Sequence, residues 1–264
     1  MRRAVSPLVP LVLLVCGAGA VSAAAQTPVG VVHVFVALAD NQHQGIVPVP
    51  ARLGNGEDPA DNLYWGAAFG VKSYFRLSAD WELESSAPRP KANVLERCVF
   101  KHRNDQVFLV ADAYEGSRIR EAVTDFLSAA AGLNQEAVVV KELRGPPLVA
   151  GGGADLVVYV GHDAFMDFQI SSIAGRSGTK PRAAIILACA SKGYFAPYLR
   201  NTGAEPLLWT TGLMAPEAYT LKAALDGWIA HEDGEAVRRR AAEAYDRYQK
   251  CGLRAAQRLF VTGW

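Results

Sequence analysis

The segment from Asp155 to Ser191 decides the fold. It contains two short apolar runs, Leu156-Val157-Val158-Tyr159-Val160 and Ala183-Ala184-Ile185-Ile186-Leu187. Both runs are rich in β-branched residues and too short for long helices, which predicts two buried strands of a parallel sheet. The first run continues into Gly161-His162-Asp163 and the second into Ala188-Cys189-Ala190-Ser191. Because the carboxyl ends of parallel strands line one crevice, we expect His162 and Cys189 to face each other across a single site.

Strand-like and helix-like segments alternate outward from this pair. Strands are expected at 31–38, 106–114, 137–140 and 206–211, and helices at 63–75, 118–131, 194–200, 216–231 and 235–250. In the region 81–101, Pro88 and Pro90 favour a loop, followed by a short strand or turn at 94–100. The alternation predicts an α/β fold: a three-layer α/β/α sandwich with a mostly parallel sheet, forming one domain over residues 26–264.

The composition excludes several classes of partner. Of the 264 residues, 50% are hydrophobic and 20% are charged, which is enough apolar material for a sizeable core. The formal net charge is +1 and the sequence pI is about 7.7, so neither nucleic acid nor an anionic membrane surface is expected as a partner.

The first 25 residues predict a secretory signal peptide. Arg2 and Arg3 precede an apolar run at 8–15, and small residues follow as far as Ala25. The apolar run is too short to span a bilayer, which disfavours an uncleaved anchor and predicts no membrane span after removal of the signal. The bulky Val15 before Cys16 disfavours a lipoprotein signal. We therefore expect an exported protein, periplasmic or extracellular.

Three cysteines remain after the expected cleavage: Cys98, Cys189 and Cys251. An odd number leaves at least one thiol unpaired within a single chain. Cys98 and Cys251 could form a disulfide with Cys189 free, and the sequence does not decide this.

A thiol and an imidazole at neighbouring strand ends suit acyl transfer. The imidazole can accept the thiol proton and later donate it to a leaving amine. Backbone N–H groups at Cys189 and in the turn after His162 would stabilise the oxyanion. Taken singly, a cysteine at the end of an apolar strand is more often a small core residue, so the prediction depends on the joint placement of the two side chains.

These two strand ends resemble those of the caspase-like cysteine peptidases, the group that includes caspases, legumains, gingipains and CHAT-type domains. The residues that carry the resemblance are 157–163, which end in Gly161-His162-Asp163, and 185–191, which contain Ala188-Cys189. Residues 208–218 are similar to the strand-to-helix segment that follows the cysteine strand in CHAT-like members. The resemblance implies a caspase-like fold with His162 as the base and Cys189 as the nucleophile. Two positions depart from the family pattern, because Asp163 stands where the family has glycine and Leu187 where it has a polar residue.

Four further polar residues are candidates for the oxyanion region or the cleft: Asp163, Asp40, Asn41 and Asp112. Each follows or ends a predicted strand, although residues of these types more often cap loops. A metal site built from Asp40, Asp163 and Asp167 is disfavoured, because the spacing matches no strong ligand motif. We expect neither a metal nor a cofactor.

Three functions are consistent with these features. The leading hypothesis is a secreted cysteine endopeptidase that hydrolyses peptide bonds of a peptide or protein substrate through a Cys189–His162 dyad. The second is a catalytically inactive caspase-like module that binds a peptide or protein in the same cleft. The third is a metal-dependent hydrolase that uses the acidic strand ends.

Overall fold

The computed structural model describes Met1 and residues 30–140, 146–171, 175, 177, 178 and 180–264. Apart from Met1, the expected signal peptide lies outside the described residues. The strands are β1 (Gly30–Ala37), β2 (Trp81–Lys91), β3 (Val94–His102), β4 (Val107–Tyr114), β5 (Glu136–Val138), β6 (Leu148–Ala150), β7 (Leu156–Val160), β8 (Ala183–Leu187), β9 (Glu205–Thr210) and β10 (Phe260–Val261). The α-helices are α1 (Val71–Leu77), α2 (Ile119–Ala130), α3 (Ser191–Thr202), α4 (Ala218–Ile229), α5 (Gly234–Gln249) and α6 (Leu253–Leu259), and the 3-10 turns are η1 (Gly116–Arg118), η2 (Gly151–Gly153) and η3 (Ala164–Met166).

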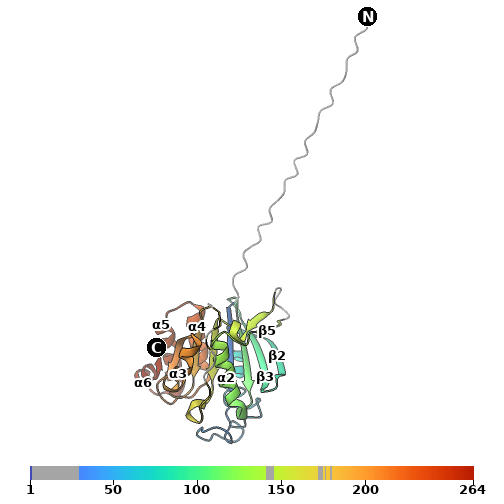
Figure 1. Cartoon of the computed structure of the whole chain (residues 1–264). Helices are drawn as coiled ribbons and strands as arrows, with labels where there is room; N and C mark the ends of the chain where they lie inside the picture. Colours follow the sequence, from blue (N-terminus) through green and yellow to red (C-terminus); the bar gives the residue numbers. More distant parts are fainter. Residues whose placement is uncertain (2–29, 141–145, 172–174, 176, 179) are drawn as a thin grey trace.

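Eight strands form one mixed sheet in the order β10-β9-β8-β7-β1-β4-β3-β2. The five strands β4, β1, β7, β8 and β9 are parallel, and β2, β3 and β10 pair antiparallel at the two sides. The central strands are almost entirely buried, as their predominantly apolar sequences predict. Their carboxyl ends lie at one edge of the sheet, near the loop after β1 at the bottom of Figure 1.

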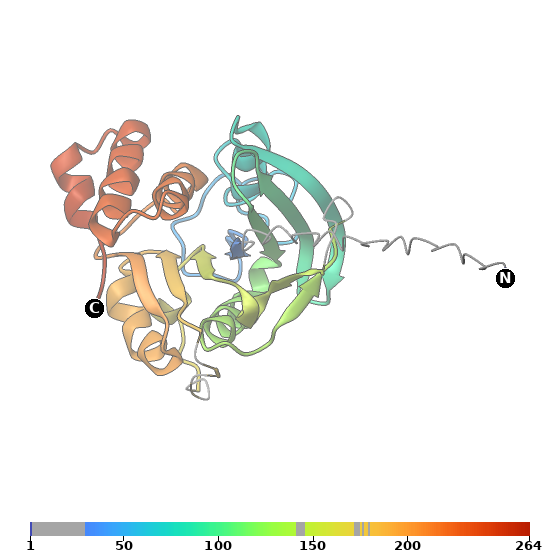
Figure 2. The same cartoon turned by 90° about the horizontal axis from the view of Figure 1, so that it is seen from above.

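Helices cover both faces of the sheet, which confirms the expected three-layer α/β/α sandwich (Figure 2). Side chains alternate between the faces along β1: Val32, Val34 and Val36 pack with α1, α4 and α5, whereas Val31 and Phe35 pack with α2 and α3. The helices on each face thus bury apolar side chains against the sheet.

The region with Pro88 and Pro90 differs from the expected loop. It forms a long antiparallel hairpin of β2 and β3, with register shifts between Leu83 and Ser85 and between Pro88 and Lys91. Proline is tolerated there because β2 is the outer strand of the sheet, where one side of the backbone has no ladder partner.

The expected helix at 63–75 is shorter, because α1 begins only at Val71. Turns precede it, and Asn62 holds them to the end of β1: its Oδ1 accepts the N–H of Ala39 at 3.0 Å and its Nδ2 donates to the carbonyl of Ala39 at 2.8 Å. The turns pack so closely that a side chain at Gly66 would collide with the backbone carbonyl of Ala60.

The three described cysteines are free thiols, so the pairing considered for Cys98 and Cys251 does not form. Cys98 lies buried on β3, whereas Cys251 is exposed just after α5. The two residues therefore differ in both exposure and layer.

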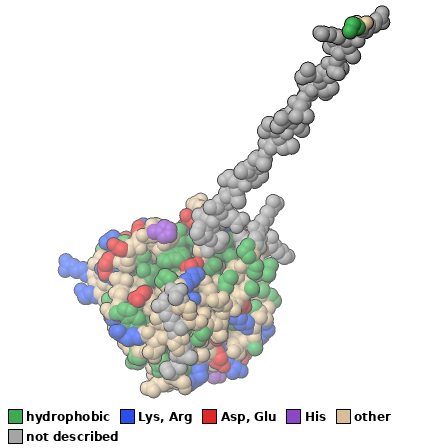
Figure 3. All heavy atoms as spheres, turned by 45° about the horizontal axis from the view of Figure 1, so that its top comes forward, with side chains coloured by type: hydrophobic (Ala, Val, Ile, Leu, Met, Phe, Trp, Pro, Cys, Tyr) green, Lys and Arg blue, Asp and Glu red, His purple; other side chains and the backbone are tan. Residues whose placement is uncertain are grey.

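The surface shown in Figure 3 carries hydrophobic side chains in several separate groups among charged ones. Among the residues that the structure describes, none of the helices is long and apolar enough to cross a membrane.

Candidate functional site

His162 and Cys189 follow adjacent strands at matching positions. Val160 on β7 pairs with Leu187 on β8, and each site residue lies two residues beyond this pair. The N–H of Gly161 donates to the carbonyl of Leu187 at 3.2 Å, which keeps the two chains together past the strand ends. Gly161 has φ of 152°, and a Cβ there would lie 2.9 Å from the carbonyl oxygen of Ala37. A glycine is therefore required before the histidine.

Cys189 stands at a sharp turn from β8 into α3. The next residue, Ala190, adopts the left-handed conformation with φ of 49° and ψ of 30°, which is unfavourable for a residue with a Cβ. The turn is fixed by the N–H of Ala190, which donates to Gly212 at 2.8 Å, and by the Ser191 hydroxyl, which donates to the carbonyl of Ile186 at 3.0 Å. A strained strand-to-helix turn is a recurrent way of presenting a nucleophile at the edge of an α/β sheet.

The His162 imidazole is held by Asp167. Its Nε2 lies 2.8 Å from Asp167 Oδ2, and this oxygen also accepts the N–H of Gly45 at 3.0 Å. The turn η3 between them reverses the chain, with Asp163 as its cap: Asp163 Oδ1 accepts the N–H of Phe165 at 3.0 Å. Asp167 thus fixes the ring orientation and leaves Nδ1 as the nitrogen that can accept a proton.

The Cys189 thiol is partly buried and bonded to the backbone of Met214. Its Sγ accepts the N–H of Met214 at 3.4 Å and donates to the carbonyl of the same residue at 3.5 Å. Burial raises the pKa of the thiol, and the charge of Asp163 raises it further, whereas the Met214 N–H lowers it. No hydrogen bond joins Cys189 and His162 in the described part of the chain, and the raised pKa favours the neutral thiol at neutral pH.

Asp163 is completely buried next to these groups. Its Oδ2 has no hydrogen-bond partner, unlike Oδ1. Burial raises the pKa of this carboxyl to about 7, with a smaller contribution from the charge of Asp167. Asp163 therefore changes charge near neutral pH within reach of the thiol.

A cavity of about 400 Å³ opens beside Cys189. Its walls come from the loop after β1, the turns before α1, η3, the segment between β9 and α4, and the end of α5. The residues are Gly45, Ile46, Val47, Leu63, Tyr64, Met166, Leu213, Met214, Ala215, Pro216, Glu217 and Gln249. The large side chains of Val47, Met166 and Leu213 are among the most exposed hydrophobic groups of the described chain. The lining residues come from segments that are far apart in the sequence, so the sequence pattern does not predict Tyr64 or Glu217 at this site.

Asp40 and Asn41 brace the loop after β1. Asp40 Oδ1 accepts the N–H of Gln42 at 2.8 Å, and its Oδ2 lies 2.8 Å from His43 Nδ1. Asn41 exchanges two hydrogen bonds with the backbone of Val49, at 2.8 and 3.1 Å. Both side chains therefore hold the loop that supplies Gly45 to Asp167, and neither lines the cavity beside Cys189.

Asp112 lies within β4, which continues to Tyr114, and takes part in a separate buried cluster. Arg97 contacts both of its oxygens at 2.6 Å, and His33 Nε2 lies 3.2 Å from Oδ2. His33 Nδ1 accepts the N–H of Gly151 at 2.9 Å, which leaves the ring proton on Nε2. Burial alone would raise the pKa of Asp112, but the hydrogen bonds from Arg97 and His33 outweigh it and lower the pKa.

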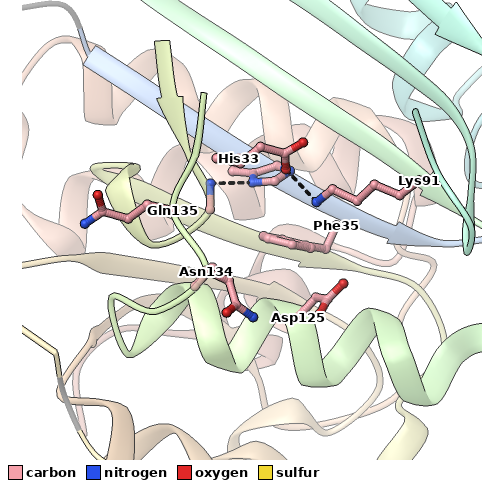
Figure 4. A pocket seen from close by; sticks show the side chains of 9 residues that line it. His33, Phe35, Lys91, Asp125, Asn134 and Gln135 are labelled. Atoms are coloured by element: carbon pink, nitrogen blue, oxygen red, sulfur yellow. Dashed lines mark hydrogen bonds and ion pairs between the residues drawn. The ribbon is translucent and has the colours of Figure 1, made fainter. Parts of the chain in front are cut away.

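This cluster lies beneath a second cavity, of about 350 Å³. Figure 4 shows His33 and Phe35 projecting from β1 toward α2, which carries Asp125. Lys91, from β2, also lines the cavity. None of the residues that line this cavity lines the cavity at Cys189.

The acidic strand ends do not gather into a metal site. Among the residues that the structure describes, no group of three or more His, Cys, Asp or Glu side chains has an arrangement suited to a metal ion. Asp40 is bonded to its own loop, and Asp167 is bonded to His162 and Gly45. These carboxylates are thus hydrogen-bonded to other groups of the same chain.

Comparison with known proteins yields no match to a family model, a curated protein or a solved structure. The fold and the site therefore define the protein by class alone. It is a three-layer α/β/α protein with a histidine and a cysteine at the ends of two adjacent parallel strands.

Proposed function

We propose that this chain is an exported caspase-like cysteine endopeptidase that hydrolyses peptide bonds. The observation that supports this most is the Asp167–His162 pair next to the strand end that carries Cys189. A nucleophile, a base and a third group that orients the base are the components that covalent acyl transfer requires.

The reaction follows from the roles of the three side chains. His162 Nδ1 accepts the Cys189 proton as Sγ attacks the substrate carbonyl carbon. The tetrahedral intermediate collapses, the C–N bond breaks, and the leaving amine takes the proton from His162. Water, deprotonated by His162, then attacks the thioester carbonyl carbon. The C–S bond breaks, the acyl group leaves as a carboxylic acid, and Sγ takes the proton back from His162. Because Nε2 is bonded to Asp167, the imidazolium is stabilised by that carboxylate at each step.

The raised pKa of the thiol fits general-base catalysis. A neutral thiol is a weak nucleophile until its proton is removed, so attack and proton transfer must occur together. The attack therefore requires a bound substrate that brings Cys189 and His162 into contact, since catalytic hydrogen bonds are often long or absent before substrate binds.

The neutral state of Cys189 and its lack of a hydrogen bond to His162 also favour a second candidate function. A neutral thiol without a hydrogen bond to His162 is also what a module that binds a peptide without cleaving it would show. The apolar cavity beside Cys189 would then hold a side chain of the bound peptide.

Hydrolysis of quenched fluorescent casein and of an internally quenched peptide library tests the proposal. The wild-type chain is expected to cleave peptide bonds, Cys189→Ala to lose all cleavage, and Cys251→Ala to keep it. Cys251 is a matched control because it is a free, exposed thiol outside the cavity. Cleavage that persists in Cys189→Ala refutes the proposal. Binding of library peptides by the wild type without any cleavage refutes it in favour of the second function.

A further inference from the structure

The cavity beside Cys189 combines an apolar wall with one carboxylate. Apolar side chains from four separated segments line the cavity together with the thiol, and Glu217 is the acidic residue among the lining side chains. Tyr64 and Glu217 line this cavity together with Cys189, and the charges of Cys189 and Glu217 both act on the Tyr64 hydroxyl. A ligand side chain that enters near the thiol therefore passes apolar groups and ends close to a carboxylate.

Glu217 is held in place but has no cation as a partner. Its Oε2 accepts hydrogen bonds from the Tyr219 hydroxyl at 2.7 Å and from Gln249 Nε2 at 3.0 Å. It is the N-cap residue of α4, yet its side chain makes no capping hydrogen bond. No Lys, Arg or His of the described chain forms an ion pair with Glu217. Other buried or partly buried carboxylates do have such partners, namely Glu96, Asp112, Glu136, Asp155 and Asp226.

We infer that this cavity binds a lysine or arginine side chain of the peptide substrate, with the aliphatic stem against the apolar wall and the charged end at Glu217. This inference rests on the proposed function in that it places the residue next to the cleaved bond. Long cationic side chains bury their methylene groups along apolar surface and keep the charge at a polar end. A purely apolar side chain would leave the Glu217 carboxylate desolvated and unpaired, and an acidic one would be repelled by it.

Glu217 suits this role because its orientation is fixed before a ligand binds. The two neutral donors, Tyr219 and Gln249, occupy one carboxylate oxygen. Oε1 has no hydrogen bond with a described residue and remains for a charge-assisted bond to an ammonium or guanidinium group. A fixed acceptor lowers the entropic cost of binding.

Peptidyl acyloxymethyl ketones test the inference directly. Three probes carry lysine, norleucine or glutamate next to the reactive group, and intact-mass spectrometry gives the second-order rate constant of Cys189 alkylation. Lysine and norleucine share the same stem and differ in the ammonium group, so their ratio isolates the contribution of that group. We expect the lysine probe to react about tenfold faster than norleucine, or more, and the glutamate probe to react most slowly. In Glu217→Gln the lysine-to-norleucine ratio should fall to about one.

Glu243→Gln is the matched control, because Glu243 is exposed on α5 and does not line the cavity. It should keep the wild-type ratio. A norleucine probe that equals or exceeds lysine on the wild type overturns the inference, as does a lysine preference that survives Glu217→Gln. If Cys189 reacts with no probe, calorimetric titration of Cys189→Ala with N-acetyl tripeptide amides that end in lysine or norleucine makes the same comparison. Tighter binding of the lysine peptide then supports the inference, and equal or weaker binding overturns it.

These outcomes separate the inference from the proposed function. Alkylation and binding do not require turnover, so a lysine preference in a chain that cleaves no peptide leaves the inference standing and refutes the peptidase. Conversely, peptide cleavage that depends on Cys189 but shows no preference for lysine or arginine refutes the inference alone.

Discussion

Asp167 Oδ2 lies 2.8 Å from His162 Nε2 and accepts, at the same time, the N–H of Gly45 at 3.0 Å. The carboxylate therefore connects the histidine to the loop after β1, which also forms part of the cavity wall. A single side chain sets the tautomer of the imidazole and the position of the loop.

Replacement of Asp167 should reduce turnover without unfolding the chain. In Asp167→Asn the amide cannot stabilise an imidazolium, so we expect kcat to fall by about 10- to 1000-fold. Kinetics of peptide hydrolysis against pH measure the effect. Asp105→Asn is the control, because it removes a carboxylate that lies 2.9 Å from the Nδ1 of another histidine, His102, away from the cavity. Equal losses in both variants would contradict the assigned role of Asp167.

Asp163 should make stability fall as the pH rises. Its pKa is raised by burial to about 7 in the folded chain, against an ordinary value of 3.8. The native state therefore binds more protons between about pH 4 and pH 7. The free energy of unfolding should fall across this range by up to about 1.4 kcal/mol per pH unit. Below this range the penalty is absent, because the carboxyl is protonated in both states.

Asp163→Asn removes this dependence while keeping an oxygen that can accept the N–H of Phe165. Urea denaturation should show a gain in stability at pH 8 and little change at pH 4. The rate of Cys189 alkylation by iodoacetamide should also rise at a given pH, because the charge of Asp163 contributes to the raised pKa of the thiol. A stability difference independent of pH would show that Asp163 is not the titrating group.

The Tyr64 hydroxyl is expected to donate a hydrogen bond to the substrate carbonyl oxygen. It lines the cavity and has no hydrogen-bond partner in the described chain, and the backbone of Tyr64 is fixed by Asn62 and Val71. Burial raises its pKa, and the charges of Cys189 and Glu217 add to this, so the hydroxyl keeps its proton. Tyr64→Phe should lower kcat/KM by about 10- to 100-fold.

Stability and thiol chemistry distinguish this role from packing. The change removes a hydroxyl without a protein partner, so the free energy of unfolding should change by less than about 1 kcal/mol. Iodoacetamide alkylation of Cys189 should be unaffected. Unchanged peptide hydrolysis in Tyr64→Phe would exclude the donor role.

Loss of the Asp112 interactions should lower the stability of the fold and leave the site at Cys189 unchanged. Arg97→Met leaves the Asp112 carboxylate buried with its main partner removed, which should cost about 3–5 kcal/mol in urea denaturation at pH 7. The folded pKa of Asp112 is lowered, so its contribution is present above its ordinary pKa and is lost as the pH falls below it. The cost should therefore shrink at pH 3.

A double variant supplies the control for Asp112. Arg97→Met combined with Asp112→Leu removes both charges and should recover much of the lost stability. Cys189 alkylation in the folded variants should match the wild type. A large change in alkylation would instead connect the Asp112 cluster to the cleft.

The parallel core strands could be predicted because each is a short, mostly apolar segment: β7 and β8 are continuous apolar runs, and β1 and β4 are each interrupted by one polar residue, His33 and Asp112. The outer strand β2 escaped prediction because it is mostly exposed and contains Pro88 and Pro90, whereas its partner β3 coincides with the short strand or turn expected at 94–100. The turns before α1 escaped for another reason: Asn62 bonds to the end of β1 instead of capping a helix, a tertiary contact that local periodicity does not contain.

The neighbouring placement of His162 and Cys189 follows from the sequence, because both terminate parallel strands. The role of Asp167 depends on the single turn η3, and the only sequence signal was an acidic residue five positions after the histidine. Tyr64 and Glu217 reach the site through the packing of separate loops, so their positions required the structure.

The prolines of β2 have a consequence for association between molecules. An outer strand with unpaired backbone groups is a template onto which another chain can add a strand. Pro88 and Pro90 remove two N–H donors there, and the opposite margin of the sheet ends in β10, which has two residues. Both margins are therefore poor templates, which protects this large sheet against edge-to-edge aggregation.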